Sequence, residues 1–180
     1  MALVSELLPN GHSWWRIADP AWSDPLDASF AMRLGGRWNP PNSFRTLYLS
    51  EDPVTARLNL RRFIERWPYE PEDLRDDTGP ILVEASLPRH QAVCDCHTRR
   101  GVAAAGLPPT YPNNRHGTPV PHSVCQAVGA RVKSSRLRGV RARSAVAQDG
   151  AGRELAWFPA SVASQARLIR RIHFQRWFWG

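Results

Sequence analysis

Five stretches of the chain carry the apolar alternation and the β-branched or aromatic residues that are typical of strands. They occupy residues 13–19, 46–50, 80–88, 139–147 and 153–160. The last two flank the turn sequence DGAG, so we expect them to pair as a hairpin.

The segment that follows the second of these strands predicts a helix. Asp52 is suited to cap it, Pro53 to occupy its first position, and Pro68 ends it near Trp67. Residues that recur at spacings of three and four mark its expected inner face: Ala56, Asn59, Leu60, Phe63 and Trp67. This pattern places the amide of Asn59 toward the interior.

Loops and two further helices account for most of the remaining chain. Loops are expected over residues 20–36, 70–79 and most of 89–121, where Pro, Gly, Asn or acidic residues cluster. Helices are expected over residues 122–135 and, briefly, near 99–105.

The two ends of the chain are less distinctive. Residues 1–12 fit a short helix or an irregular lead-in, and residues 166–180 fit either a strand or a basic helix. Strands and helices mix without a βαβ rhythm, which favours an α+β fold. We therefore predict a single domain over residues 1–180, with a central mixed or antiparallel sheet and flanking helices.

The net charge of +8 is carried almost wholly by arginine, since Lys133 is the only lysine. Such a surface suits anionic partners, although a GC-rich coding sequence also produces an arginine excess. No apolar run approaches the roughly 20 residues of a membrane span. The first residues lack the basic region of a signal peptide, and three cysteines argue against a disulfide framework, so we expect a cytoplasmic protein.

Two clusters have both a chemical and a structural interpretation. A zinc site needs four ligands from the set Cys94, Cys96, His97, His122 and Cys125, but a C-x-C spacing is too tight for the usual zinc ribbon. Ordinary buried thiols are the preferred interpretation, and no metal is expected. In the tail, four arginines at 167, 170, 171 and 176 accompany Trp177 and Trp179. They suit nucleic acid, or a terminal element that packs its aromatic rings inward and its arginines outward, which we prefer.

The stretch GGRWNPP followed by LYLS contains the strongest candidate chemistry. Gly35 and Gly36 allow the backbone to approach a ligand closely, and Arg37 follows this turn, where it is suited to a phosphate. Tyr48 on the next strand is able to stack on a heterocycle. Ser144, in RARSA, lacks a G-x-S-x-G elbow and is expected to act as a hydrogen-bonding hydroxyl rather than a nucleophile. Each residue alone also fits an ordinary structural position.

Taken together, WRI, GGRWNPP, LYLS, PVTARLN and GVRARSA resemble the RES-domain family over residues 13–160. The resemblance implies an ADP-ribosyltransferase-like fold and an NAD-consuming toxin, with a helix-turn-helix antitoxin as its partner. Nucleic acid is then contacted only through the antitoxin. The acceptor of the ADP-ribosyl group is left open among phosphate, water and a protein side chain.

The resemblance also implies roles for individual residues. Arg16 and Arg37 match the family's arginines and are expected to bind the phosphates of NAD, and Tyr48 matches the tyrosine that stacks on nicotinamide. Ser144 matches the family's serine and is expected to contact a phosphate or ribose. The family's glutamate falls at Asn59, which is able to hold ribose hydroxyls but brings no negative charge.

Loss of that charge leaves three alternatives. Cleavage of the nicotinamide–ribose bond builds positive charge on the sugar, which a carboxylate stabilises. Glu154 is the preferred substitute, ahead of Glu84, whereas Glu65 points to another side of the helix. We therefore expect an NAD-cleaving enzyme, with an attenuated protein that still binds NAD or its antitoxin as the alternative. The basic charge alone leaves a nucleic-acid-binding protein as a further alternative.

Overall fold

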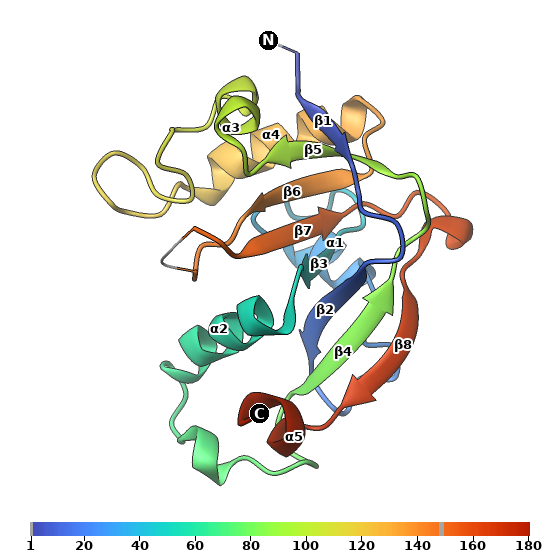
Figure 1. Cartoon of the computed structure of the whole chain (residues 1–180), viewed down its shortest axis with the longest axis vertical. Helices are drawn as coiled ribbons and strands as arrows, with labels where there is room; N and C mark the ends of the chain where they lie inside the picture. The colour runs from blue at the N-terminus through green and yellow to red at the C-terminus, as the bar shows by residue number, and fades with distance from the viewer. Residues whose placement is uncertain (1, 148–149) are drawn as a thin grey trace.

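One mixed eight-stranded sheet organises the computed structural model, which describes residues 2–147 and 150–180 (Figure 1). The strands are β1 (Ser5–Leu7), β2 (Ser13–Ala18), β3 (Leu47–Ser50), β4 (Ile81–Ser86), β5 (Ala92–Cys96), β6 (Gly139–Arg143), β7 (Arg153–Trp157) and β8 (Arg167–Ile172). Their order across the sheet is β1-β5-β6-β7-β3-β2-β4-β8. Only the β5–β6 pair among them is parallel. The predicted α+β class with a mixed sheet is confirmed.

Five helices accompany the sheet in the described part of the chain. They are α1 (Ser29–Leu34), α2 (Pro53–Ile64), α3 (Arg99–Ala105), α4 (His122–Ser134) and α5 (Phe174–Phe178). Helices α3 and α4 lie over the β5–β6 part of the sheet, while α2 and α5 lie beside β2 and β4 (Figure 1). Each pair buries its own apolar cluster: Val102, Val128 and Val132 in the first, Leu60 and Phe174 in the second. None of the helices described has the length and apolar character needed to cross a membrane.

All five predicted strands are present, and the predicted hairpin is the antiparallel pair β6–β7, in which Val140 faces Ala156. Its turn begins at Asp149, which lies outside the described residues. Strand β7 also pairs with β3, where Ser50 faces Glu154. This second pairing brings Glu154 to the middle of the sheet, beside the strand that carries Tyr48.

Helix α2 begins as predicted, because the Asp52 carboxylate accepts a 2.7 Å hydrogen bond from the Thr55 backbone nitrogen. It ends at Ile64 rather than near Trp67. The predicted inner face was partly wrong, since Phe63 is 59% exposed and Ile64 is buried. The helix packs Leu60 and Ile64 against the sheet, which rotates Phe63 outward.

Three other expectations were wrong. Residues 1–12 contain β1 rather than a helix, the loop at 20–36 contains α1, and the 89–121 segment begins with β5. The strands β1 and β5 pair with each other, and a short strand of this kind is decided by its partner rather than by its own pattern. The tail divides into the exposed strand β8 and the buried helix α5. Trp177 packs inward and the four arginines face outward, which confirms this part of the preferred interpretation, but Trp179 is 48% exposed.

Candidate active site

A cavity of about 680 Å³ lies between α2, the strands β2, β3 and β7, and the segment that follows α1. This volume is in the range of sites for nucleotides and drug-sized ligands. Among the residues that line it are Arg16, Arg37, Tyr48, Asn59 and Glu154. Five of the six residues singled out from the sequence thus meet on one cavity wall, although they come from segments far apart in the chain.

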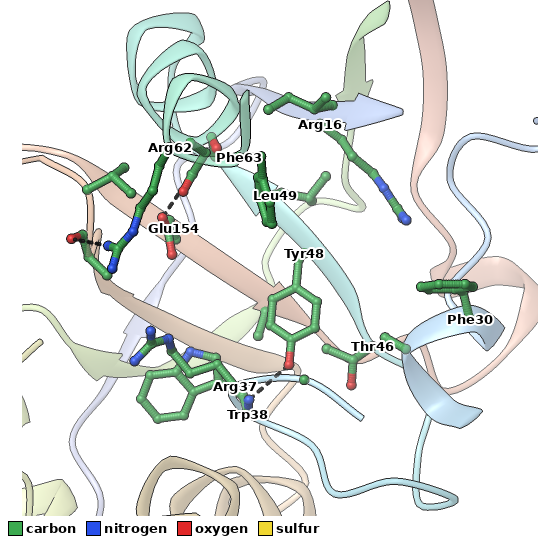
Figure 2. Close-up of a pocket in the computed structure, with 18 of the residues that line it drawn as sticks. Arg16, Phe30, Arg37, Trp38, Thr46, Tyr48, Leu49, Arg62, Phe63 and Glu154 are labelled. Carbon is green, nitrogen blue, oxygen red and sulfur yellow. Dashed lines mark hydrogen bonds between the residues drawn. The ribbon is translucent and has the colours of Figure 1, made fainter. Parts of the chain in front are cut away.

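The carboxylate of Glu154 is the centre of a hydrogen-bonded group at one side of the cavity (Figure 2). Its Oε1 accepts a 2.9 Å hydrogen bond from Nδ2 of Asn59 and a 2.8 Å hydrogen bond from Oγ of Ser144. Two neutral donors on one oxygen hold the carboxylate in place. The negative charge that Asn59 does not supply is therefore present on the neighbouring strand, in direct contact with Asn59.

Ser144 lies behind the cavity wall rather than on it. Its side chain is fully buried, and its hydroxyl donates to Glu154 and accepts from the Val146 backbone nitrogen at 3.3 Å. The predicted contact of Ser144 with a phosphate or ribose stays a prediction, and in this arrangement the hydroxyl is occupied by Glu154 and Val146. The geometry makes Ser144 a residue that positions Glu154.

Tyr48 presents its ring to the middle of the cavity while its hydroxyl is held by the protein (Figure 2). The hydroxyl donates to Oδ1 of Asn39 at 2.7 Å and accepts from the Trp38 backbone nitrogen at 2.9 Å. Burial raises the pKa of Tyr48, so the phenol stays neutral. Only the ring is left for a ligand, which agrees with a stacking role.

Gly35 and Gly36 pack closely against neighbouring residues, and Gly36 leaves space for the ring of Tyr48. A Cβ at Gly36 would lie 2.4 Å from Oη of Tyr48, which leaves no room for a side chain. Gly35 has a φ of 75°, a conformation that favours glycine. Gly36 thus approaches Tyr48 closely and Gly35 approaches Pro41, while both glycines line the cavity, so their predicted approach to a ligand stays a prediction.

The two arginines lie on opposite sides of Tyr48 (Figure 2). Nη1 of Arg37 is buried and has no hydrogen-bond partner among the described residues. Burial and the charge of Arg37 lower the pKa of His122, which also lines the cavity. Arg16 instead extends toward Phe30, and its Nη1 donates to the Asp27 carbonyl at 3.4 Å. Arg16 and Arg37 therefore lie in different parts of the cavity, and their predicted contacts with the phosphates of NAD stay predictions.

Several cavity residues were not predicted from the sequence, among them Trp22, Phe30 and Arg62. Arg62 lies one helical turn beyond Asn59, so the spacing of three residues was a signal for it. Its Nη1 donates to the Ala145 carbonyl at 3.3 Å. Trp22 and Phe30 lie in a segment that was predicted as a loop, where no periodicity marks a direction.

The cavity thus has two distinct ends. We call the group Arg37, Asn59, Arg62 and Glu154 the carboxylate end, and the group Arg16, Trp22 and Phe30 the aromatic end. Tyr48 lies between them (Figure 2).

The other glutamates considered from the sequence are excluded from the cavity. Glu84 is buried beside β8, where it accepts a 2.6 Å hydrogen bond from Ser13 and pairs with Arg170. Glu65 caps the exposed end of α2. Neither lines the cavity, so among the described residues Glu154 is the carboxylate on its wall.

The cysteines and histidines do not form the zinc site considered above. All three cysteines are buried and free, and Cys94 and Cys96 approach to 3.8 Å between their sulfur atoms. Across residues 2–147 and 150–180, one group brings three possible metal ligands together: Glu6, Asp95 and His97. Their atoms are already used, because Asp95 accepts from the His97 and Thr98 backbone nitrogens and Glu6 pairs with His97 and Arg141.

The RES domain matches residues 13–177. NAD(+) phosphorylase MbcT from Mycobacterium bovis and from Mycobacterium tuberculosis is 28% identical over 128 residues, which are 67% of this chain. The chain spans 61% of the length of these curated relatives.

The fold has a counterpart among crystal structures. A chain in the structure of the M. tuberculosis MbcT–MbcA toxin–antitoxin complex superimposes with a TM-score of 0.72 at 22% identity. The likeness covers 99% of this chain and 91% of that chain. Since the RES domain match extends over most of the sequence and includes every cavity residue named above, the chain belongs to the RES domain family.

Proposed function

We propose that the protein cleaves NAD at the bond between nicotinamide and ribose. The observation that carries this proposal is the position of Glu154, a carboxylate held by Asn59 and Ser144 on the wall of a nucleotide-sized cavity. The name of the mycobacterial relative, an NAD(+) phosphorylase, supports the choice of substrate.

The reaction breaks the bond from ribose C1′ to the pyridinium nitrogen. The electron pair of that bond passes to the ring, which leaves as neutral nicotinamide, and positive charge develops on the sugar. Glu154 stabilises this charge without reorganising, because its position is already set by two hydrogen bonds. Tyr48 stacks on the nicotinamide, and Asn59 keeps its carbonyl oxygen for a ribose hydroxyl.

The oxygen of an acceptor then forms the new bond to C1′. We propose inorganic phosphate as this acceptor, with water and a protein side chain as the alternatives. Arg37 and Arg62 lie at the carboxylate end, where positive charge favours an anionic acceptor beside Glu154. The name of the relative again supports phosphorolysis.

Purified protein incubated with NAD tests both parts of the proposal. Chromatography should show nicotinamide release, with ADP-ribose 1″-phosphate as the second product when inorganic phosphate is present. A product of free ADP-ribose under all conditions indicates hydrolysis. Folded protein that releases no nicotinamide, with or without phosphate, contradicts the proposed activity.

We also propose that the protein is the toxin half of a toxin–antitoxin pair and acts in the cytoplasm, where NAD is abundant. The likeness in fold to a chain of a toxin–antitoxin complex motivates this, and the partner expected from the family resemblance is a helix-turn-helix antitoxin. Expression of the chain alone should arrest growth and deplete cellular NAD. Co-expression of the product of a neighbouring helix-turn-helix gene should restore both.

A further inference from the structure

Two large aromatic side chains lie exposed at one end of the cavity. Trp22 is 36% and Phe30 is 45% exposed, and their ring centroids are 5.9 Å apart with a tilt of 38°. Both rings also border a second hollow of about 330 Å³. Single exposed aromatics are common on protein surfaces, but a contacting pair on a cavity wall presents a flat apolar face to open space.

Arg16 completes this end of the cavity. Its guanidinium lies 5.6 Å from the centre of the Trp22 ring, a cation–π contact. In the described part of the chain its hydrogen bond is to the Asp27 carbonyl, and it forms no ion pair with a carboxylate. Burial lowers the pKa of Arg16, while Asp27 and Asp24 oppose this. A guanidinium stays charged in proteins and carries five N–H donors, so Arg16 has donors to spare for a phosphate.

The order of these features follows the order of groups in a dinucleotide. Glu154 lies on one side of Tyr48, and Arg16 and Phe30 lie on the other (Figure 2). In the proposed function, the nicotinamide riboside occupies the carboxylate end. The rest of an extended NAD molecule, its phosphates and then its adenosine, must therefore run toward the aromatic end.

We propose that Trp22 and Phe30 form the stacking surface for the adenine ring of NAD, and that Arg16 holds the phosphate next to the adenosine. The assignment rests on the proposed function for its choice of ligand. It makes the aromatic end a determinant of affinity for the adenylate half, with no part in bond cleavage.

Comparison of two substrates tests this assignment. NAD has the adenylate half, and nicotinamide mononucleotide lacks it while keeping the same scissile bond. Trp22→Ala and Phe30→Ala should each lower kcat/KM for NAD on the order of tenfold to a hundredfold, the usual effect of removing a base-stacking ring. The loss should appear in KM, and kcat/KM for nicotinamide mononucleotide should stay within twofold of wild type.

Tyr69→Ala is the matched control, since this ring is 43% exposed but lies outside the cavity. Tyr69→Ala should leave kcat/KM unchanged for both NAD and nicotinamide mononucleotide. The assignment is overturned if Trp22→Ala and Phe30→Ala lower kcat/KM equally for both substrates, or if they lower it for neither.

Calorimetry with ADP separates this inference from the proposed function, because it needs no turnover. ADP should bind the wild type, and Phe30→Ala should weaken that binding at least fivefold. A wild type that cleaves no NAD but binds ADP through Phe30 refutes the proposed activity and supports the stacking surface. A wild type that cleaves NAD but whose affinity for ADP is unchanged by Phe30→Ala refutes the stacking surface alone.

Discussion

The carboxylate end and the aromatic end of the cavity are built in different ways. At the carboxylate end, Asn59 on α2 and Glu154 on β7 are joined by a side-chain hydrogen bond over 95 residues of sequence. Ser144, behind this end, holds Glu154 from the end of β6 over 10 residues. At the aromatic end, Trp22 and Phe30 lie on a loop and a six-residue helix. No hydrogen bond joins these rings to the cavity wall in the described residues.

Short hydrogen bonds between side chains and nearby backbone shape the segment that carries the aromatic end. The carboxylates of Asp19, Asp24 and Asp27 each accept a hydrogen bond from a backbone nitrogen two residues later, at 2.8, 2.9 and 2.8 Å. Local turns of this kind shape the segment. Hydrogen bonds to its backbone carbonyls, such as that from Nη2 of Arg171 to Ser23 at 3.1 Å, join it to the sheet. The difference suggests that positions needed for chemistry are fixed by the sheet, while those needed for recognition are left adaptable. Variants at the carboxylate end should therefore change kcat, and those at the aromatic end should change KM.

The largest effect is expected for Glu154→Gln. The substitution keeps the size of the side chain and removes the charge that stabilises the developing cation. We expect kcat for NAD cleavage to fall about a hundredfold to a thousandfold, with KM little changed. Initial rates of nicotinamide release measure this, and Glu65→Gln, which removes an exposed carboxylate outside the cavity, is the control. A Glu154→Gln protein with full activity would show that the carboxylate end is not where the bond is cleaved.

Exchanging Asn59 and Glu154 tests whether the negative charge must be carried by β7. The side chains of Asn59 and Glu154 are in hydrogen-bond contact, so exchanging them moves the carboxylate to α2 by only a short distance. Asn59→Glu combined with Glu154→Asn should recover at least about tenfold of the activity lost in Glu154→Asn alone. Asn59→Glu alone should lower activity, because it brings two like charges together. A folded double variant without recovery would show that the strand position itself is required.

Ser144→Ala should have a smaller effect at the same end. It removes one of the two hydrogen bonds that hold Glu154, and kcat should fall about fivefold to tenfold with KM unchanged. The free energy of unfolding should fall by about 1 kcal/mol, since the serine is buried. Ser134→Ala, at an exposed position of α4, should alter neither quantity. A rise in KM instead of a fall in kcat would mean that Ser144 contacts the substrate after all.

The contrast between the ends also explains what was predictable from the sequence. Arg16, Arg37 and Tyr48 lie inside short continuous motifs, and Glu154 was identified because it follows Ser144 across a hairpin, a local pairing. The burial of Ser144 was not predictable, because it depends on how Gly152 and α2 pack over the strand end. Trp22 and Phe30 were missed because exposure of an aromatic ring in a loop leaves no pattern, and only the folded cavity shows that they face one ligand.

The smallest expected effect is on the pKa of His122, which Arg37 should influence and Arg16 should not. Burial and the charge of Arg37 lower the pKa of this imidazole, so the folded protein binds fewer protons there than the unfolded chain. His122 should therefore titrate below the usual imidazole range in NMR spectra, and stability should fall slightly as the pH drops through that range.

Arg37→Gln removes one of the two causes and should move the pKa of His122 upward, while burial keeps it below the usual value. Arg16→Gln removes an equal charge on the other side of Tyr48 and should leave the His122 titration unchanged. Equal shifts in the two variants would mean that the two ends share one electrostatic environment, and the division of the cavity would then apply only to its hydrogen bonds.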